Sequence, residues 1–328
     1  MKTKHRGGRV VLAGMMAGLM LAGGCVSVDL AKLMSKDLQE IVVEEGEGWG
    51  GRDKVLLVDV SGIIMEGGGG LFADATCSPE YIKAVLRRAE ADERVKAVVL
   101  RIDSPGGTVG ASELIAREVA RFRERTGLPV YAQINGLGCS GGYYVAAACE
   151  KIHIQPSAIT GSIGVIAIFP KYKKLADKVG FEEEVIKSGA LKDIGNGMRE
   201  MTGEERAVLQ GLIDGNYDGF LAWILRSRPQ VGDRETLKKA ADGRIYTAAQ
   251  ALELKLVDRI CFLDETLLAA RTAAQAEDAK VVTYGYAESP DANIYSSAAV
   301  ESPVKLGVQL PGLSGPHSGF YYLWMPGH

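Results

Sequence analysis

The sequence is poor in histidine and cysteine, and its positive and negative charges nearly cancel. Only four histidines occur in 328 residues, and three of them lie close to an end of the chain. A Ser-His-Asp triad therefore has one candidate histidine in the body of the chain, His153. None of the five cysteines forms a Cys-x-x-Cys pair, which argues against the common zinc-binding and redox motifs. A net charge of −3 provides no basic face, so nucleic acid is not an expected partner.

What is present is the composition of a globular protein with a real core. Hydrophobic residues make up 47% of the chain and charged residues 24%. The length allows one large domain or two small ones. Cys139 and Cys149 are expected to be small core residues, and neither a metal nor a cofactor is expected. A disulfide is permitted in an exported protein, but the sequence does not select a pair.

The first 25 residues have the pattern of an export signal. A basic stretch precedes residues 10–24, an apolar run that is short for a membrane span and typical of a signal peptide. The small residues before Cys25 resemble the lipobox of bacterial lipoproteins. This resemblance implies a signal peptide at 1–24, a lipid on Cys25 and a tether at 25–52. The alternatives are an ordinary signal peptide and an uncleaved anchor. In each case the body lies outside the cytoplasm, and the lipid would hold it to a membrane, facing the periplasm or the cell exterior.

Strand and helix patterns alternate through the first half of the chain. Apolar runs predict strands at 54–60, 97–102 and 130–134, each followed by a helical pattern, with an edge strand at 39–44. Such alternation predicts an α/β fold of stacked βα units around a mostly parallel sheet. The second half is expected to be largely helical, and the expected segments there are strands at 151–155, 163–169 and 184–187 and helices at 172–179, 202–228, 233–241, 248–255 and 263–274.

The stretch at 138–144 places Ser140 between an apolar strand and a small-residue helix, with glycines beside it. Such a turn lets a substrate carbonyl approach the backbone, and a helix N-terminus favours developing negative charge. Ser140 is therefore a candidate nucleophile, and the alternative interpretation is a helix N-cap. A second stretch, 103–108, predicts a tight turn after which Gly107 presents its N–H to a ligand.

A nucleophilic serine needs a base. His153 alternates with Ile152 and Ile154 on a predicted strand, which favours a structural role. The other known arrangement is a Ser-Lys dyad. A lysine acts as a base only when neutral, a form that an apolar pocket favours. Lys192 lies in a loop that contains glycine and fits this role better than lysines on polar helix faces.

Four short motifs occur in order along the chain. They are Ile102-Asp103-Ser104-Pro105-Gly106-Gly107, Ser140-Gly141-Gly142-Tyr143-Tyr144, Thr160-Gly161-Ser162-Ile163-Gly164-Val165, and Ser188-Gly189 with Lys192-Asp193. In order and separation they resemble the signal peptide peptidase A family of Ser-Lys peptidases, which have the ClpP/crotonase fold. The resemblance extends over about residues 53–270, and we expect a peptidase domain at 53–275 followed by a tail at 276–328.

The resemblance implies a role for each matched residue. Ser140 is the nucleophile, Lys192 the general base, and Ser162 a hydroxyl that orients the lysine. The backbone N–H groups of Gly107 and Gly141 form the oxyanion hole. Family members of this short form assemble into rings, commonly octamers, so a homo-oligomer is expected. Cys139 stands where the family usually has alanine and Leu191 where an aromatic residue is common, which puts the pocket shape and the substrate preference in question.

Several functions fit the residues. The first is a membrane-associated serine endopeptidase that cleaves apolar peptides, such as signal-peptide remnants, and a quality-control protease for membrane proteins belongs to the same class. A catalytically inactive lipid-anchored scaffold ring and a crotonase-type enzyme acting on thioesters are the rivals. Residues 285–328 are rich in Gly, Pro and Ser but end in an aromatic cluster at 320–325. Because a disordered tail does not usually end in this way, we expect that cluster to dock on the body or on a neighbour.

Overall fold

The computed structural model describes residues 38–46, 52–66, 76–285, 292–296 and 319–324. All of them belong to one unit that begins at Leu38. The predicted signal peptide, Cys25 and most of the predicted tether lie outside the described residues. Within the described part of the chain, no helix combines the length and the apolar character needed to cross a membrane.

The elements keep the order that the sequence pattern predicts. The strands are β1 (Gln39–Glu44), β2 (Lys54–Ile64), β3 (Thr76–Cys77), β4 (Val95–Thr108), β5 (Val130–Cys139), β6 (Lys151–Ile154), β7 (Ile159–Gly161), β8 (Ile166–Ile168), β9 (Ile245–Thr247), β10 (Arg259–Ile260), β11 (Lys280–Gly285) and β12 (Gly319–Leu323). The helices are α3 (Pro79–Ala91), α4 (Val109–Thr126), α5 (Gly141–Ala146), α6 (Lys173–Val179), α7 (Gly203–Ser227), α8 (Arg234–Ala240), α9 (Ala248–Glu253) and α10 (Leu263–Ala273), with a 3-10 turn at Pro229–Val231.

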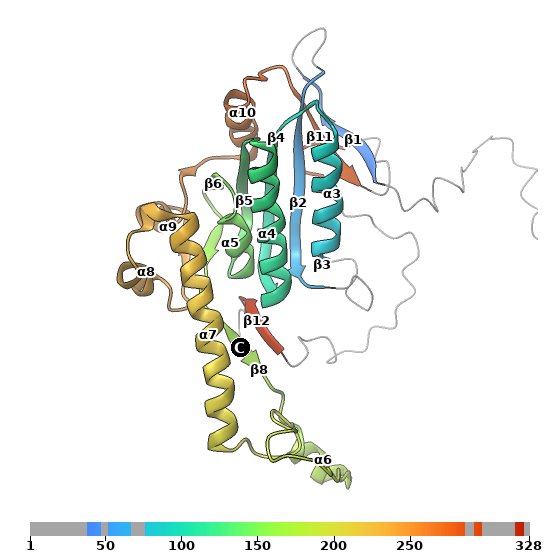
Figure 1. Ribbon diagram of the computed structural model, residues 1–328, viewed down its shortest axis with the longest axis vertical. Helices are drawn as coiled ribbons and strands as arrows, with labels where there is room; N and C mark the ends of the chain where they lie inside the picture. The colour runs from blue at the N-terminus through green and yellow to red at the C-terminus, as the bar shows by residue number, and fades with distance from the viewer. Residues whose placement is uncertain (1–37, 47–51, 67–75, 286–291, 297–318, 325–328) are drawn as a thin grey trace, which may run out of the picture. The chain divides into compact units, whose positions relative to one another are not determined.

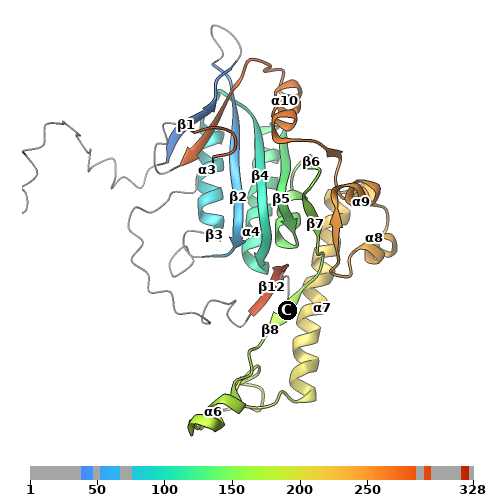
Figure 2. The ribbon, with the colours of Figure 1, turned by 180° about the vertical axis from the view of Figure 1, so that it is seen from behind.

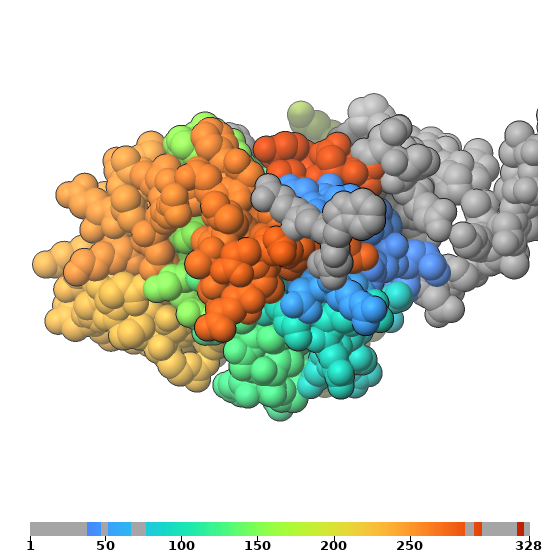
Figure 3. Space-filling view, turned by 90° about the horizontal axis from the view of Figure 1, so that it is seen from above, coloured from blue at the N-terminus to red at the C-terminus, as the bar shows by residue number. Residues whose placement is uncertain are grey.

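A mostly parallel sheet in the order β1-β11-β2-β4-β5-β6-β10 forms the centre of this unit (Figure 1). β11, β2, β4, β5, β6 and β10 run parallel, and β1 closes one edge as an antiparallel strand on β11. Figure 3 shows from above that late, orange-red segments of the chain lie beside the blue segments near its start, as the pairing of β1 with β11 requires. The predicted α/β fold and the predicted edge strand at 39–44 are both confirmed.

The central strands are buried on both faces. Along β2, Leu56 and Val58 point into the core shared with α3 and α4, whereas Val55 and Leu57 point into the core shared with α10. Figure 2 shows the face opposite to α3 and α4. Because both faces are covered, the strand reads as a continuous apolar run rather than as an alternating one. Full burial of each such side chain contributes roughly 1.5–3 kcal/mol.

Helix ends follow local sequence signals. The Ser78 hydroxyl accepts the N–H of Tyr81 at the start of α3, and Gly127 ends α4 with a left-handed φ of 68°. At α7, Thr202 and Glu205 form a reciprocal capping box. The start of α7 agrees with the helix predicted at 202–228. The four described cysteines are buried and free, as expected for Cys139 and Cys149.

Four local predictions are wrong. The stretch at 103–108 does not turn back, because β4 continues to Thr108 with Gly106 at a φ of 101°. The segment predicted as a strand at 184–187 has no regular structure, and the strand predicted at 163–169 is reduced to β8. The small-residue helix expected after the stretch at 138–144 begins within that stretch, as α5. In the first and last cases glycines lie at the end of the strand or at the start of the helix. These boundaries could not be predicted there, because glycine has no strong conformational preference.

The aromatic end of the chain docks on the body, as predicted. β12 pairs antiparallel with the end of β4 and with β8. Tyr322 is fully buried there, and Tyr321 and Leu323 are nearly so.

Candidate active site

Ser140 occupies the sharp turn between β5 and α5. Its backbone has φ 51° and ψ −114°, a conformation that non-glycine residues rarely adopt. The turn is held because the Ser140 N–H donates to Gly161 O at 2.8 Å and its carbonyl accepts the Tyr144 N–H at 2.9 Å. The side chain makes no capping hydrogen bond with α5, so the N-cap interpretation is not supported. A serine on a strained strand-to-helix turn is the local geometry of a nucleophile elbow.

Ser162 lies beside Ser140 because of the strand register. In the parallel pair of β5 and β7, Cys139 is opposite Gly161, and each serine is the next residue. Ser162 also has a positive φ, 48°, and its N–H donates to Arg244 O at 2.7 Å. Both serines are buried, with side chains 1% and 8% exposed. The two serines that the sequence marks therefore lie at the same end of the sheet, where both line one cavity.

The predicted oxyanion donors are also neighbours. A methyl group built on Gly141 would lie 3.1 Å from the nitrogen of Gly107. The Gly141 N–H is at the first position of α5, where the helix offers it no acceptor. A methyl group on Gly107 would lie 1.7 Å from Ile64 O, so only glycine fits between β4 and β2. Two backbone N–H groups thus lie together next to Ser140, the arrangement that stabilises the oxyanion in acyl transfer.

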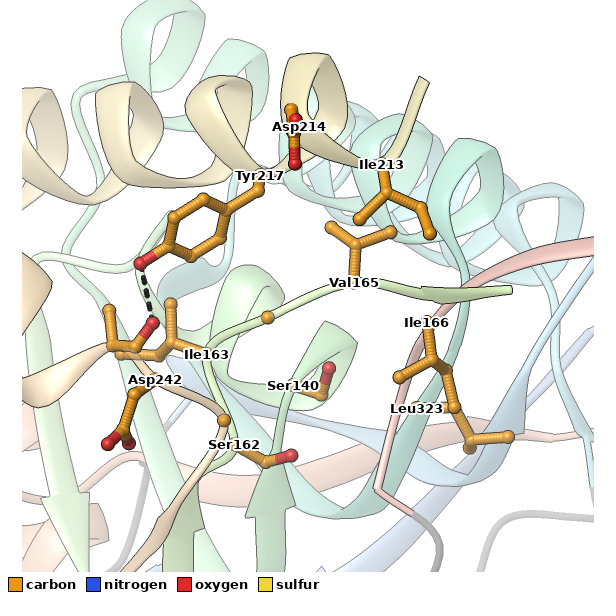
Figure 4. Close-up of a pocket in the computed structure, with 13 residues that line it drawn as sticks. Ser140, Ser162, Ile163, Val165, Ile166, Ile213, Asp214, Tyr217, Asp242 and Leu323 are labelled. Carbon is orange, nitrogen blue, oxygen red and sulfur yellow. Dashed lines mark hydrogen bonds between the residues drawn. The ribbon is translucent and has the colours of Figure 1, made fainter. Parts of the chain in front are cut away.

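A cavity of about 330 Å³ opens in front of the two serines (Figure 4). Its walls combine apolar and polar groups, and they are formed by residues of the segment 163–166, of α7, of the turn 241–243 and of β12. Tyr217 closes one side, where its hydroxyl donates to Ala241 O at 2.6 Å. Asp242 at the rim is paired with Arg244, which lowers the pKa of its carboxyl through hydrogen bonds and charge. No lysine or histidine is among the described residues that line this cavity.

Lys192 lies outside this cavity in its own chain. It is exposed, and it belongs to a loop that packs against the segment around α6, for example through Tyr172 N–H on Gly197 O at 3.1 Å. Asp193 next to it is paired with Lys187 and Arg199, and hydrogen bonds from Arg199 and Lys187 hold the pKa of this carboxyl far below its usual range. The structure therefore brings Ser140, Ser162, Gly107 and Gly141 together and leaves Lys192 apart.

His153 is not placed to act on Ser140. It pairs in register with Gln133, seven residues before Ser140 along β5. Its Nδ1 lies 2.8 Å from Thr266 Oγ1, and its ring packs edge-on against Tyr131. Burial lowers the pKa of His153 to about 4. The structure thus gives this histidine a role in the core.

The sequence did not identify an aromatic cluster next to the site. Tyr144 stacks on Trp223 at 5.4 Å and lies 4.9 Å from Phe220, between ring centres. The Trp223 indole N–H donates to Tyr144 O at 2.9 Å. Tyr144 follows Ser140 in its motif, which is the one signal that could have marked it. Phe220 and Trp223 were indistinguishable from other apolar residues of α7.

A strained serine, a second hydroxyl and two clustered N–H groups define the machinery of a serine hydrolase. The family model described as Peptidase family S49 matches residues 123–277. The "Putative signal peptide peptidase SppA" of Enterococcus faecium is 33% identical over 251 residues, which cover 76% of this chain and 71% of that protein. The "Putative protease slr0021" of Synechocystis is 38% identical over 70% of this chain and 78% of that protein. The "Serine protease SPPA, chloroplastic" of Arabidopsis thaliana is 30% identical over 71% of this chain and 34% of that protein.

These matches show that the chain belongs to peptidase family S49, the signal peptide peptidase A family. It is a serine peptidase with a ClpP/crotonase-like fold, as the four motifs indicated.

Proposed function

We propose that the chain is a membrane-associated serine endopeptidase that cleaves apolar peptides, such as signal-peptide remnants after their release. One observation carries the proposal: Ser140 lies on a strained turn beside the N–H groups of Gly107 and Gly141. Apolar side chains on one part of the adjoining cavity, such as Ile163, Val165 and Ile213, favour apolar substrates.

The reaction is acyl transfer. The Ser140 Oγ attacks a peptide carbonyl carbon while its proton passes to the neutral amine of Lys192. The carbonyl oxygen becomes negative and is stabilised by the N–H groups of Gly107 and Gly141, by roughly 3–4 kcal/mol per donor. The lysine then gives the proton to the leaving amine as the C–N bond breaks, and water hydrolyses the ester on Ser140. Ser162 orients the lysine through its hydroxyl.

A second copy of the chain supplies the lysine in this proposal. Lys192 is exposed and outside the cavity of its own chain, so it needs a neighbour in order to reach a Ser140. The segment that carries it also exposes large apolar side chains, at Leu175 (64%), Val179 (71%), Phe181 (57%) and Ile186 (94%). A surface of this kind is typical of a protein interface. In a closed ring every chain makes the same contacts, so each Ser140 receives a Lys192 from a neighbour and each apolar surface is covered. Members of the family form such rings, commonly octamers.

A complementation experiment tests this arrangement. Ser140→Ala and Lys192→Ala should each lower the rate of hydrolysis of an apolar fluorogenic peptide by roughly 10⁴-fold or more. Co-expressed together, they should regain activity at about a quarter of the sites, because one variant supplies the serine and the other the lysine. Lys174→Ala, an exposed lysine on α6, is the matched control and should be fully active.

Other outcomes discriminate among the alternatives. Full activity in Lys192→Ala would show that another base works here. Two inactive variants that fail to complement would place the lysine in the same chain as the serine. A wild type that assembles but hydrolyses nothing would support the scaffold function. Hydrolysis of an intact membrane protein in preference to free signal peptides would support a quality-control role.

We also propose export and anchoring through a lipid on Cys25, which the pattern at 1–25 supports. Cys25→Ser should move the protein from the membrane pellet to the soluble fraction without changing its activity on soluble peptides. Membrane association that is unchanged in this variant would contradict the lipid anchor.

A further inference from the structure

Ser104 is a fully buried polar residue on β4, a few residues before Gly107. It is not among the described residues that line the cavity in front of Ser140, so it has no place in substrate binding there. A buried hydroxyl has lost its hydrogen bonds to water, which costs free energy unless protein atoms replace them. The partners that Ser104 has inside the protein therefore indicate what its hydroxyl does.

β4 departs from the regular ladder on both sides near Ser104. Its register with β2 shifts between Ser61 and Ile63, and its register with β5 shifts between Ile102 and Ser104. Shifts of this kind leave backbone groups without their usual ladder partners. The next residue, Pro105, has no N–H to donate. The ladder alone therefore does not fix the direction of the strand where it reaches the active site.

The Ser104 hydroxyl makes two hydrogen bonds with the backbone at this irregularity. Its oxygen accepts the Gly106 N–H at 3.1 Å, and its proton is donated to Gly62 O at 2.6 Å. Gly106 has a φ of 101°, in the region that favours glycine, and its other conformations are close in energy. The next N–H along the strand is that of Gly107, the predicted oxyanion donor. The direction of this N–H depends on the orientation of Gly106, and therefore on the Ser104 hydroxyl.

Ser104 also contacts the other side of the predicted oxyanion hole. A methyl group built on Gly142 would lie 2.8 Å from Ser104 O and 3.4 Å from Ser104 Cβ. Gly142 belongs to the first turn of α5 and follows Gly141, the second predicted donor. Ser104 therefore lies between the strand that carries one donor and the helix that carries the other.

We propose that Ser104 is a positioning residue of the reaction, whose hydroxyl holds the Gly107 N–H at the place where the oxyanion forms. The hydroxyl acts through the backbone of Gly106 and not on the substrate. Its loss therefore affects the transition state, in which the carbonyl oxygen is negative, much more than it affects substrate binding. This inference rests on the proposed use of Ser140 as the nucleophile and of Gly107 as an oxyanion donor.

The experiment compares Ser104→Ala and Ser104→Cys with the wild-type chain in the hydrolysis of an apolar fluorogenic peptide. Alanine lacks the hydroxyl, whereas the thiol of cysteine fills a similar space but is a weak hydrogen-bond partner. Both variants should lower kcat by about 30-fold and change KM by no more than about twofold. Thr266→Val is the matched control, because it removes an equally buried hydroxyl from α10, which packs on the other face of the sheet. Its kcat should stay within about twofold of the wild type even if its melting temperature falls.

Three kinetic results would overturn the inference. The first is wild-type kcat in Ser104→Ala. The second is wild-type kcat in Ser104→Cys, because filled space would then be sufficient without the hydrogen bonds. The third is an equal loss in Ser104→Ala and Thr266→Val, which would reflect a general loss of stability. If Ser104→Ala does not fold, the result for Ser104→Cys decides.

Amide hydrogen exchange separates this inference from the peptidase proposal. Mass spectrometry of the segment 103–108 should show exchange that is faster by roughly tenfold or more in Ser104→Ala, and unchanged in Thr266→Val. If the wild type hydrolyses nothing, the peptidase proposal fails and the exchange rates decide the role of Ser104. Equal exchange in the wild type and in Ser104→Ala would then overturn the positioning of Gly107 by Ser104, and faster exchange would support it.

Discussion

At the scale of single residues, the site depends on glycines, which have no side chain. Gly141 must have no side chain, because a methyl group there would lie 2.4 Å from Ser112 Oγ and 3.1 Å from the nitrogen of Gly107. The Ser112 hydroxyl can rotate away from this contact, but the Gly107 backbone cannot move without a shift of β4. A larger residue would therefore disturb the oxyanion hole more than the fold.

We expect Gly141→Ala to lower kcat by about 100-fold or more with a small change in KM, since the lost stabilisation acts on the transition state. Steady-state hydrolysis of an apolar peptide measures both constants. Gly203→Ala is the matched control, because a methyl group there meets nothing within 4 Å. Equal losses of kcat in the two variants would show that the effect is not specific to the site.

Because His153 is buried, the free energy of unfolding is expected to depend on pH. Its pKa is lowered by burial to about 4, against 6.5 in the unfolded chain. Between these two values the unfolded state binds more protons than the folded state. The free energy of unfolding therefore falls as the pH is lowered from about 6.5 to about 4, by at most about 3 kcal/mol from this group.

Urea unfolding at several pH values between 7.5 and 4.5 measures this dependence, and His153→Gln isolates it. The variant should lose less stability than the wild type over this range, because glutamine takes up no proton. Identical pH slopes in the two proteins would rule out the assigned role of His153.

At the scale of elements, features set by nearby residues could be predicted from the sequence better than pairings between distant segments. The βα order, the helix caps and the turn at Ser140 follow from nearby residues, and the structure has all three. The extension of β4 through Gly106 could not be predicted, because it depends on partners in β2 and β12. The pairing of β12 with β4 and β8 could not be predicted for the same reason, although its aromatic residues indicated that it would be buried. The place of Lys192 depends on packing between loops, which has no periodic signal.

The loop that carries Lys192 is tied to α7 by charged side chains. Arg199 bridges Asp193, at 2.7 Å, and Glu205, whose carboxylate also accepts the N–H of Thr202. Burial of Glu205 and the bidentate geometry make this bridge stronger than an ordinary surface pair.

Arg199→Ala should therefore loosen the loop and lower kcat/KM by roughly tenfold, since misplacing a catalytic group by a small distance reduces the rate. Arg206→Ala removes the same charge from an exposed site on α7 and should leave the rate unchanged. Limited proteolysis should show faster cleavage within 188–200 in the first variant alone. Equal rates in the two variants would exclude a positioning role for Arg199.

At the scale of the whole molecule, the proposed ring makes activity depend on assembly. Ile186 is 94% exposed in the single chain and lies in the segment that carries Lys192. Ile186→Asp should convert the oligomer to monomers on gel filtration and abolish hydrolysis, without lowering the melting temperature of the monomer. Leu268→Asp, at a residue of α10 that is 58% exposed, is the control. Monomers that retain full activity would contradict the supply of the lysine by a neighbour.

β12 pairs antiparallel with the end of β4 on one side and with β8 on the other, so its backbone is extended over its five residues. Loss of this strand would leave unpaired backbone groups on both of its neighbours. The last described strand is therefore part of the sheet, and a chain cut before residue 319 would expose two strand edges to other molecules.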